Sequence, residues 1–161
     1  MLLNNAGFAG CPGASYVTGE ARHRVLEVLC HRYLREKQHV MRFRQHADRI
    51  ADADIRRELL RIAAKEEDHV RAIEDRIADL GGQLPRVIEI HCGRENTWAY
   101  LRSDLDEERR CIAEIEEDKI AIAGEFPEVA GLLERIETDA KKHREEIRAL
   151  LSNETRPQWA A

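Results

Sequence analysis

Hydrophobic residues recur every three to four positions over most of the chain, which is the period of an amphipathic α-helix that buries one face. This pattern predicts four helices, over residues 18–49, 55–80, 97–124 and 127–150. The polar run ADAD interrupts it at 51–54, and the pair Gly81–Gly82 follows the second stretch. Glycine readily adopts the left-handed turn that ends many helices, so we expect the second helix to stop there.

Residues suited to helix starts precede the last three predicted helices. Asp52 or Asp54 can cap the second helix and Asn96 the third, because their side-chain oxygens accept the free backbone N–H groups of a first turn. Pro127 suits the first turn of the fourth, where no backbone N–H is needed. These residues support the helix boundaries that the hydrophobic pattern predicts.

The segment QLPRVIEIHCGREN, residues 83–96, has no helical spacing and is long enough to run back along a bundle. Short connections join the other predicted helices. We therefore expect an all-α fold, a four-helix bundle with one long crossover connection. The bundle is expected over 18–152, with a flexible tail at 1–17 and a polar tail at 153–161.

Composition is that of a single globular domain, with 161 residues of which 43% are hydrophobic and 35% charged. The net charge is -5 and both signs are mixed along the chain, which argues against nucleic acid as a partner. No run of about 18 apolar residues exists, so we expect no membrane span. The four cysteines form no C-x-x-C pair, which favours plain thiols in a cytoplasmic protein.

The buried face of each predicted helix is interrupted near its middle by ionisable residues. These are Glu36 in the first helix, Glu66 and His69 in the second, Glu108 in the third and His143 in the fourth. A bundle brings mid-helix positions to one level, where carboxylates buried without a cation would cost several kcal/mol each or become protonated. The pattern therefore predicts a buried metal ion.

The spacing of Glu66 and His69 suits one ion, because residues three apart are neighbours on one helix face. Oxygen-rich sites with one imidazole per metal are typical of iron or manganese, whereas structural zinc favours thiolates and more histidines. We expect iron, with manganese as the alternative. The other histidines, His23, His31, His46 and His91, are expected at the surface, and residues 116–118 on a solvated helix face.

Four motifs give the chain a family resemblance. They are LREKQHVMRFRQHA with Glu36, IAAKEEDHVRAIEDRIADLGGQLP with Glu66 and His69, DLDEERRC with Glu108, and IETDAKKHREEI with His143. Over residues 20–151 the chain resembles the ferritin-like superfamily, in its rubrerythrin and bacterioferritin branch. The resemblance implies two irons, held by a glutamate from each of helices one and three and an E-x-x-H motif from each of helices two and four.

Ala140 departs from this pattern, because it stands where the second bridging glutamate belongs. Asp139, four residues before His143, is interpreted as a shorter substitute ligand. The expected metal ligands are therefore Glu36, Glu66, His69, Glu108, Asp139 and His143. His39 and Cys111 lie one turn beyond Glu36 and Glu108; we expect a partly exposed imidazole and a small buried thiol, with orientation towards the metal as the alternative.

The resemblance implies a ferroxidase or peroxidase-type oxidoreductase that reacts with dioxygen or hydrogen peroxide. Without paired cysteines, its electron donor is expected to be a separate protein. Haem is not expected, because neither Met1 nor Met41 lies on the second helix. A homodimer is expected, packed through apolar residues of the crossover. The alternative is a bundle that has lost catalysis with its missing glutamate and serves as a metal carrier or interaction module.

Overall fold

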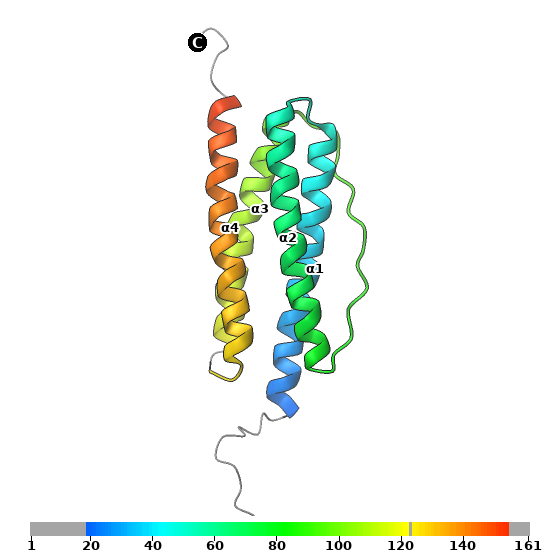
Figure 1. The fold of residues 1–161 in the computed structure, drawn as a ribbon, viewed down its shortest axis with the longest axis vertical. Coiled ribbons are helices and arrows are strands. Elements are labelled where there is room, and N and C mark those ends of the chain that lie inside the picture. Colours follow the sequence, from blue (N-terminus) through cyan, green and yellow to red (C-terminus); the bar gives the residue numbers. More distant parts are fainter. Residues whose placement is uncertain (1–18, 123, 155–161) are drawn as a thin grey trace, which may run out of the picture.

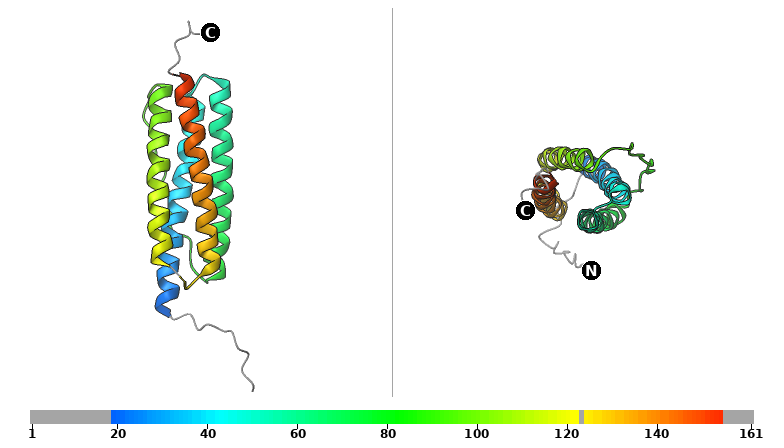
Figure 2. Two further views of the ribbon diagram at one scale, coloured as in Figure 1. Left: turned by 90° about the vertical axis from the view of Figure 1, so that its left-hand side faces the viewer. Right: turned by 90° about the horizontal axis from the view of Figure 1, so that it is seen from above.

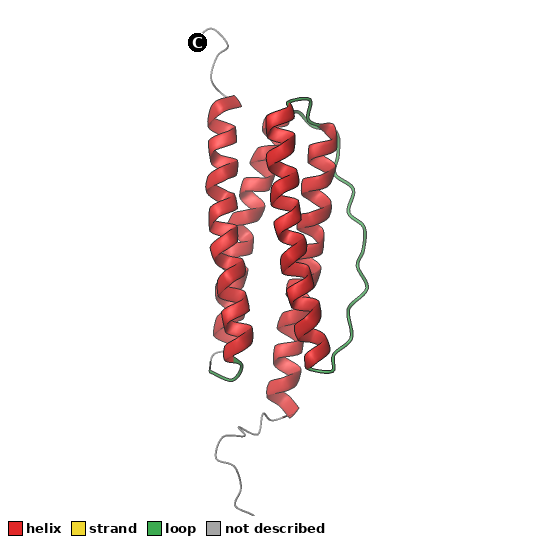
Figure 3. Ribbon diagram, viewed as in Figure 1, coloured by secondary structure: helices red, strands yellow, loops and turns green. Residues whose placement is uncertain are grey.

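A computed structural model describes residues 19–122 and 124–154, which form four α-helices without a strand in this part of the chain (Figure 1, Figure 3). The helices are α1 (Gly19–Arg49), α2 (Ala53–Asp79), α3 (Thr97–Ala121) and α4 (Pro127–Glu154). The predicted all-α four-helix bundle is confirmed. The predicted tail at 1–17 lies outside the described residues, and α4 continues two residues past the expected limit at 152.

Two antiparallel hairpins, α1 with α2 and α3 with α4, pack side by side to form the bundle (Figure 1, Figure 2). Smaller contacts join α1 to α3 and α2 to α4. The crossover after α2 returns along the outside of α1 to the end where α3 begins (Figure 1). Gln45 holds it, since its Nε2 donates to the Ile90 carbonyl at 2.7 Å and its Oε1 accepts from the Cys92 N–H at 2.9 Å.

The helix ends confirm the local signals in the sequence. The Asp52 carboxylate accepts hydrogen bonds from the backbone N–H groups of Asp54 and Ile55 at 2.8 and 3.0 Å. Asn96 caps α3 in the same way, through the N–H of Ala99 at 2.9 Å. Gly81 has φ 64°, a left-handed conformation that residues with a Cβ rarely adopt.

The apolar core consists of two clusters separated along the bundle axis. One cluster contains Val25, Leu29, Ile73, Ile77, Ile115 and Leu133, and the other contains Phe43, Leu59, Ile62, Leu101 and Ile147. The ionisable residues predicted at the middle of each helix fall between the two clusters. Among the described residues, no helix is long and apolar enough to cross a membrane.

Trp98 departs from the hydrophobic pattern of α3. It is apolar and lies in the helical period, but its side chain is 42% exposed. It lies in the first turn of α3, where it packs beside Arg102, whose guanidinium carbon is 5.3 Å from the ring centroid. Tyr100 and Leu101 fill the core at this level instead.

Candidate metal centre

Five predicted ligands meet in one buried layer, to which every helix contributes. Glu36 comes from α1, Glu66 and His69 from α2, Glu108 from α3 and His143 from α4. None of the five residues is more than 6% exposed. The layer is buried because the two hairpins close over it, with an apolar cluster on either side along the bundle axis.

Glu66 occupies the centre of this layer. Its Oε2 lies 2.9 Å from Nδ1 of His69, while its Oε1 lies 2.8 Å from Nδ1 of His143. His69 Nδ1 is also 3.5 Å from Glu36 Oε2, and His143 Nδ1 is 3.6 Å from Glu108 Oε1. The layer therefore has two sides that share Glu66: one with Glu36 and His69, the other with Glu108 and His143.

Several polar atoms of the layer have no hydrogen-bond partner despite their burial. They are both carboxylate oxygens of Glu36 and of Glu108, and Nδ1 of His143, whose close approach to Glu66 lacks hydrogen-bond geometry. Leaving such groups unpaired costs about 1–3 kcal/mol each, and more when they are charged. Buried oxygen and nitrogen atoms that face one another without partners fit a metal ion well.

Protons partly offset the carboxylate charge in the metal-free protein. Burial and the charge of Glu66 raise the pKa of Glu36 to about 7, and burial raises that of Glu108. Burial lowers the pKa of His69, but the nearby carboxylates of Glu36 and Glu66 outweigh this and raise the pKa to about 11. Burial also lowers the pKa of His143, but the nearby carboxylates of Glu108 and Glu66 outweigh this and raise the pKa to about 9. A metal ion must displace these protons.

Asp139, the predicted substitute ligand, lies at the edge of the layer. Its side chain is 26% exposed, and its Oδ2 lies 2.9 Å from Nε2 of His69 and 3.3 Å from Nζ of Lys65. His69 therefore directs Nδ1 towards the layer and Nε2 towards Asp139. Such a carboxylate holds the orientation and tautomer of a ligating imidazole. Asp139 therefore contacts the outer nitrogen of His69, while Ala140 is 2% exposed and belongs to the apolar cluster of Val25 and Ile73.

His39 was expected to be partly exposed, but it is 1% exposed because α3 packs over it. One of its ring nitrogens belongs to a group with carboxylate oxygens of Glu66 and Glu108 in which all atoms lie within 4.8 Å of one another. One donor atom each of Glu36, Glu66 and His69 also lies within 4.8 Å of the other two. The sequence signal for His39 was its position one turn after Glu36.

Arg32 is a buried charge that the sequence pattern did not reveal. Its side chain is fully buried, and its Nη1 lies 3.4 Å from the Cys111 sulfur and 3.8 Å from Glu36 Oε1. Its Nη2 donates to Asp118 Oδ2 at 2.6 Å. Asp118 was expected on a solvated face, but its side chain is only 14% exposed because it pairs with Arg32.

His46 was expected at the surface, and the structure buries it at 2% exposure. Its Nδ1 lies 2.9 Å from Asp104, and its ring stacks on Tyr100 with centroids 4.4 Å apart. These contacts satisfy the histidine between α1 and α3. It therefore differs from His39, whose two ring nitrogens have no hydrogen-bond partner.

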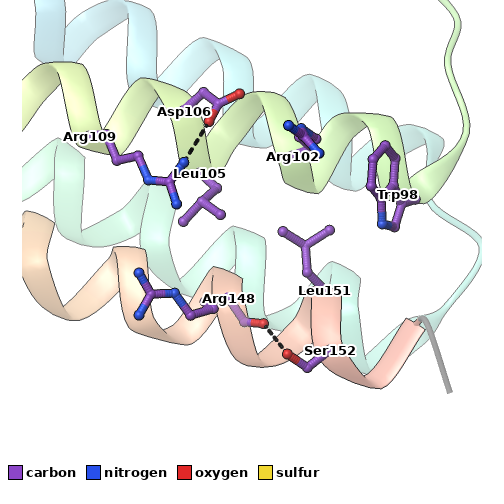
Figure 4. A pocket seen from close by; sticks show the side chains of 8 residues that line it. All are labelled: Trp98, Arg102, Leu105, Asp106, Arg109, Arg148, Leu151 and Ser152. Atoms are coloured by element: carbon purple, nitrogen blue, oxygen red, sulfur yellow. Dashed lines mark hydrogen bonds and ion pairs between the residues drawn. The ribbon is translucent and has the colours of Figure 1, made fainter.

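The hollow between α3 and α4 lies apart from the buried layer. The hollow in Figure 4, of about 300 Å³, lies between α3 and α4. Its lining residues are Trp98, Arg102, Leu105, Asp106, Arg109, Arg148, Leu151 and Ser152. Asp106 is already paired with Arg109 at 3.1 Å, and no residue of the carboxylate layer reaches this hollow. The chemistry suggested by the sequence therefore lies in the bundle interior.

Four helices with a crossover after the second, and a carboxylate and histidine layer from all four, define a ferritin-like four-helix bundle. No protein-family profile and no curated protein matches this chain in sequence. Solved structures share the fold. The bacterioferritin of Desulfovibrio desulfuricans, described with a diiron site, has a TM-score of 0.75 and 22% identity over 83% of this chain and 81% of its own.

Two further solved structures extend the comparison. A dodecameric thioferritin from Bacteroides fragilis, described as bacterioferritin-related, has a TM-score of 0.74 and 17% identity over 82% of this chain and 86% of its own. The Dps protein of Thermosynechococcus elongatus has a TM-score of 0.76 and 12% identity over 88% and 97%. At such identities the likeness establishes the ferritin-like fold.

Proposed function

We propose that this protein binds iron in the buried layer and acts as a ferroxidase or peroxidase-type oxidoreductase. The observation that carries the proposal is the set of unpartnered oxygens of Glu36 and Glu108 on either side of Glu66. An oxygen-rich set with few imidazoles suits iron, with manganese as the alternative. The diiron site described for the similar D. desulfuricans bacterioferritin supports the choice of iron.

Each residue has a defined part in this proposal. Glu36 and His69 would hold one ion and Glu108 and His143 the other, with Glu66 between them. When bound, ferrous iron supplies electrons to dioxygen or hydrogen peroxide. His69 gives up its Nδ1 proton on binding, while its Nε2 stays directed at Asp139, 2.9 Å away. The apolar clusters on both sides keep bulk water from the carboxylates.

A metal carrier or interaction module is the second candidate, favoured by the buried methyl of Ala140. A glutamate at this position would complete the pair of E-x-x-H motifs. Without it the α3 and α4 side has fewer negative charges to stabilise ferric iron. A bundle with this deficit would hold ferrous ions without turning over an oxidant.

Adding ferrous iron to the metal-free protein in air tests these proposals. Bound iron together with oxidation faster than in buffer supports the oxidoreductase, and the rise in ferric absorption measures it. Bound iron that oxidises no faster than in buffer supports the carrier. No bound iron contradicts both and leaves an interaction module. Glu36→Gln and Glu108→Gln, which keep side-chain volume, should each lower iron binding.

The assembly, location and partners of the protein remain predictions. A homodimer could pack through the crossover, where Ile88 is 75% and Leu84 49% exposed. The similar B. fragilis protein is described as a dodecamer, so sedimentation should be compared with both sizes. A separate electron-donor protein and a cytoplasmic location are proposed with the oxidoreductase function.

A further inference from the structure

The α3 and α4 side of the layer lacks a donor, and a histidine from α1 faces the same space. On that side Glu108 and His143 share Glu66 with the other side, and position 140, three residues before His143, is an alanine without a donor atom. His39 is 1% exposed, and neither of its ring nitrogens has a hydrogen-bond partner. A buried imidazole with two unsatisfied nitrogens requires an explanation.

Pairing with Glu107 does not account for His39. The two residues approach at 3.5 Å, between Nε2 and Oε1, without a hydrogen bond. Glu107 is neutralised by other groups, because Arg35 donates to its Oε1 at 2.5 Å and Arg110 donates to its Oε2. Arg42 adds a third guanidinium at 3.7 Å. The carboxylate of Glu107 therefore has its counterions without an imidazolium.

We propose that His39 is a metal ligand that completes the second position together with Glu66, Glu108 and His143. This inference rests on the proposed metal-binding function. One donor atom each of His39, Glu66 and Glu108 lie within 4.8 Å of one another. Two ligands that are each about 2.1 Å from an ion are at most about 4.2 Å apart, so the three side chains must draw together when they bind one ion.

The imidazole of His39 differs in charge from a glutamate carboxylate, the group that is missing at position 140. A neutral imidazole supplies a nitrogen ligand but no negative charge. The second position therefore favours divalent ions that bind nitrogen well, such as ferrous, cobaltous and zinc ions, over manganous ion. It also stabilises trivalent iron less than the first position does, because fewer anionic ligands surround it.

A sulfur-containing position is the competing arrangement, since Glu36, His39 and Cys111 also bring donor atoms within 4.8 Å of one another. The guanidinium of Arg32 already lies 3.4 Å from the Cys111 sulfur and 3.8 Å from Glu36 Oε1. A metal ion there would face this fixed positive charge. Burial also raises the pKa of the Cys111 thiol well above its ordinary value, which disfavours the ligating thiolate.

Titration of the metal-free protein with cobaltous ion tests the assignment, because its visible absorption reports the ligands. We expect two ions in the native protein. His39→Ala should keep the first ion and weaken the second at least about tenfold, an effect typical of losing one supporting group at a metal site. Added imidazole should restore the second ion. The matched control is His46→Gln, also on α1 and buried, which should leave both affinities within about threefold.

The possible results separate this inference from the proposed function. Equal binding of the second ion by His39→Ala and by the native protein would overturn the role of His39 while leaving metal binding intact. A single bound ion in the native protein would also overturn the role of His39. A thiolate-to-cobalt absorption band that disappears in Cys111→Ser would place the ion at the competing sulfur position. Absence of any cobalt binding would overturn the proposed function itself.

Discussion

Both hairpins of the bundle contribute side chains to the buried layer from matching helix positions. The residue types at these positions differ between the two hairpins. Around their histidines, α2 and α4 align without gaps, and both His69 and His143 are buried. Three residues earlier, α2 has Glu66 and α4 has Ala140. The first helix of each hairpin also differs one turn past its glutamate. There α1 has His39 and α3 has Cys111.

Under the proposed function, this inequality gives the two metal positions different charges on one scaffold. Burial and helix geometry are alike in the two hairpins, so the difference lies in the side chains. The α1 and α2 side has Glu36 and a histidine fixed by Asp139, whereas the α3 and α4 side depends on Glu66 from the other hairpin. We therefore expect the two positions to bind metal with unequal affinity.

The largest expected effect comes from removing the shared residue. Glu66→Ala should abolish binding at both positions, a loss of at least about 100-fold, because each position loses a charged oxygen ligand in a buried site. Glu67→Ala is the control, since Glu67 pairs with Arg44 away from the layer. Metal analysis after dialysis measures both. Equal losses in the two variants would mean that the layer does not hold the metal.

Metal should stabilise the native fold strongly, because it relieves the repulsion among Glu36, Glu66 and Glu108. Free metal at 100 times its dissociation constant adds about 2.7 kcal/mol, or roughly 5–10 °C in melting temperature for a chain of this size. Thermal melts with ferrous ion under argon, or with manganous ion, measure the shift. An unchanged melting temperature at saturating metal would contradict the site.

The pH dependence should differ between the metal-free and metal-bound forms. Since contacts with Glu108 and Glu66 raise the pKa of His143 to about 9 in the folded protein, His143 stabilises the metal-free fold fully below its ordinary pKa of about 6.5. This stabilisation is lost as the pH rises through about 9. Metal affinity should rise over the same interval, because fewer protons compete. Melts across pH 6 to 10 test this, and parallel curves for the two forms would contradict it.

Ala140→Glu should make the two hairpins more alike. The new carboxylate supplies the second position with a negative ligand, so its affinity should rise about tenfold or more. The metal-free protein should lose about 1–3 kcal/mol of stability, because one more buried carboxylate is unpaired. Ala63→Glu, at an equally buried alanine in the apolar cluster, should destabilise without any gain in affinity. An equal gain in affinity in both variants would show that position 140 does not face the metal.

The smallest expected effect concerns the support of His69. Asp139→Asn keeps the shape of the side chain but removes the charge 2.9 Å from His69 Nε2. Metal affinity at the first position should fall about tenfold, with the second position little changed. Calorimetric titration resolves the two steps. A loss confined to the second position would instead support Asp139 as the substitute ligand there.

The sequence alone determined the fold and most of the buried layer. Helical periodicity, the caps at Asp52 and Asn96 and the glycine pair after α2 are local signals, each contained within a few residues. Glu36, Glu66 and Glu108 could be found because each interrupts an apolar stripe within its own helix. Such interruptions mark the inward face whichever helix packs against it.

Only the tertiary structure decided the surroundings of that layer. The burial of His39 and Arg32 depends on α3 covering their side of α1, and α3 is far away in the sequence. Asp139 meets His69 only across the interface between α2 and α4, a contact that no pattern within one helix contains. Periodicity records which face of a helix is buried, but not which side chain of another helix will meet it, because interhelical packing brings together residues without local sequence relation.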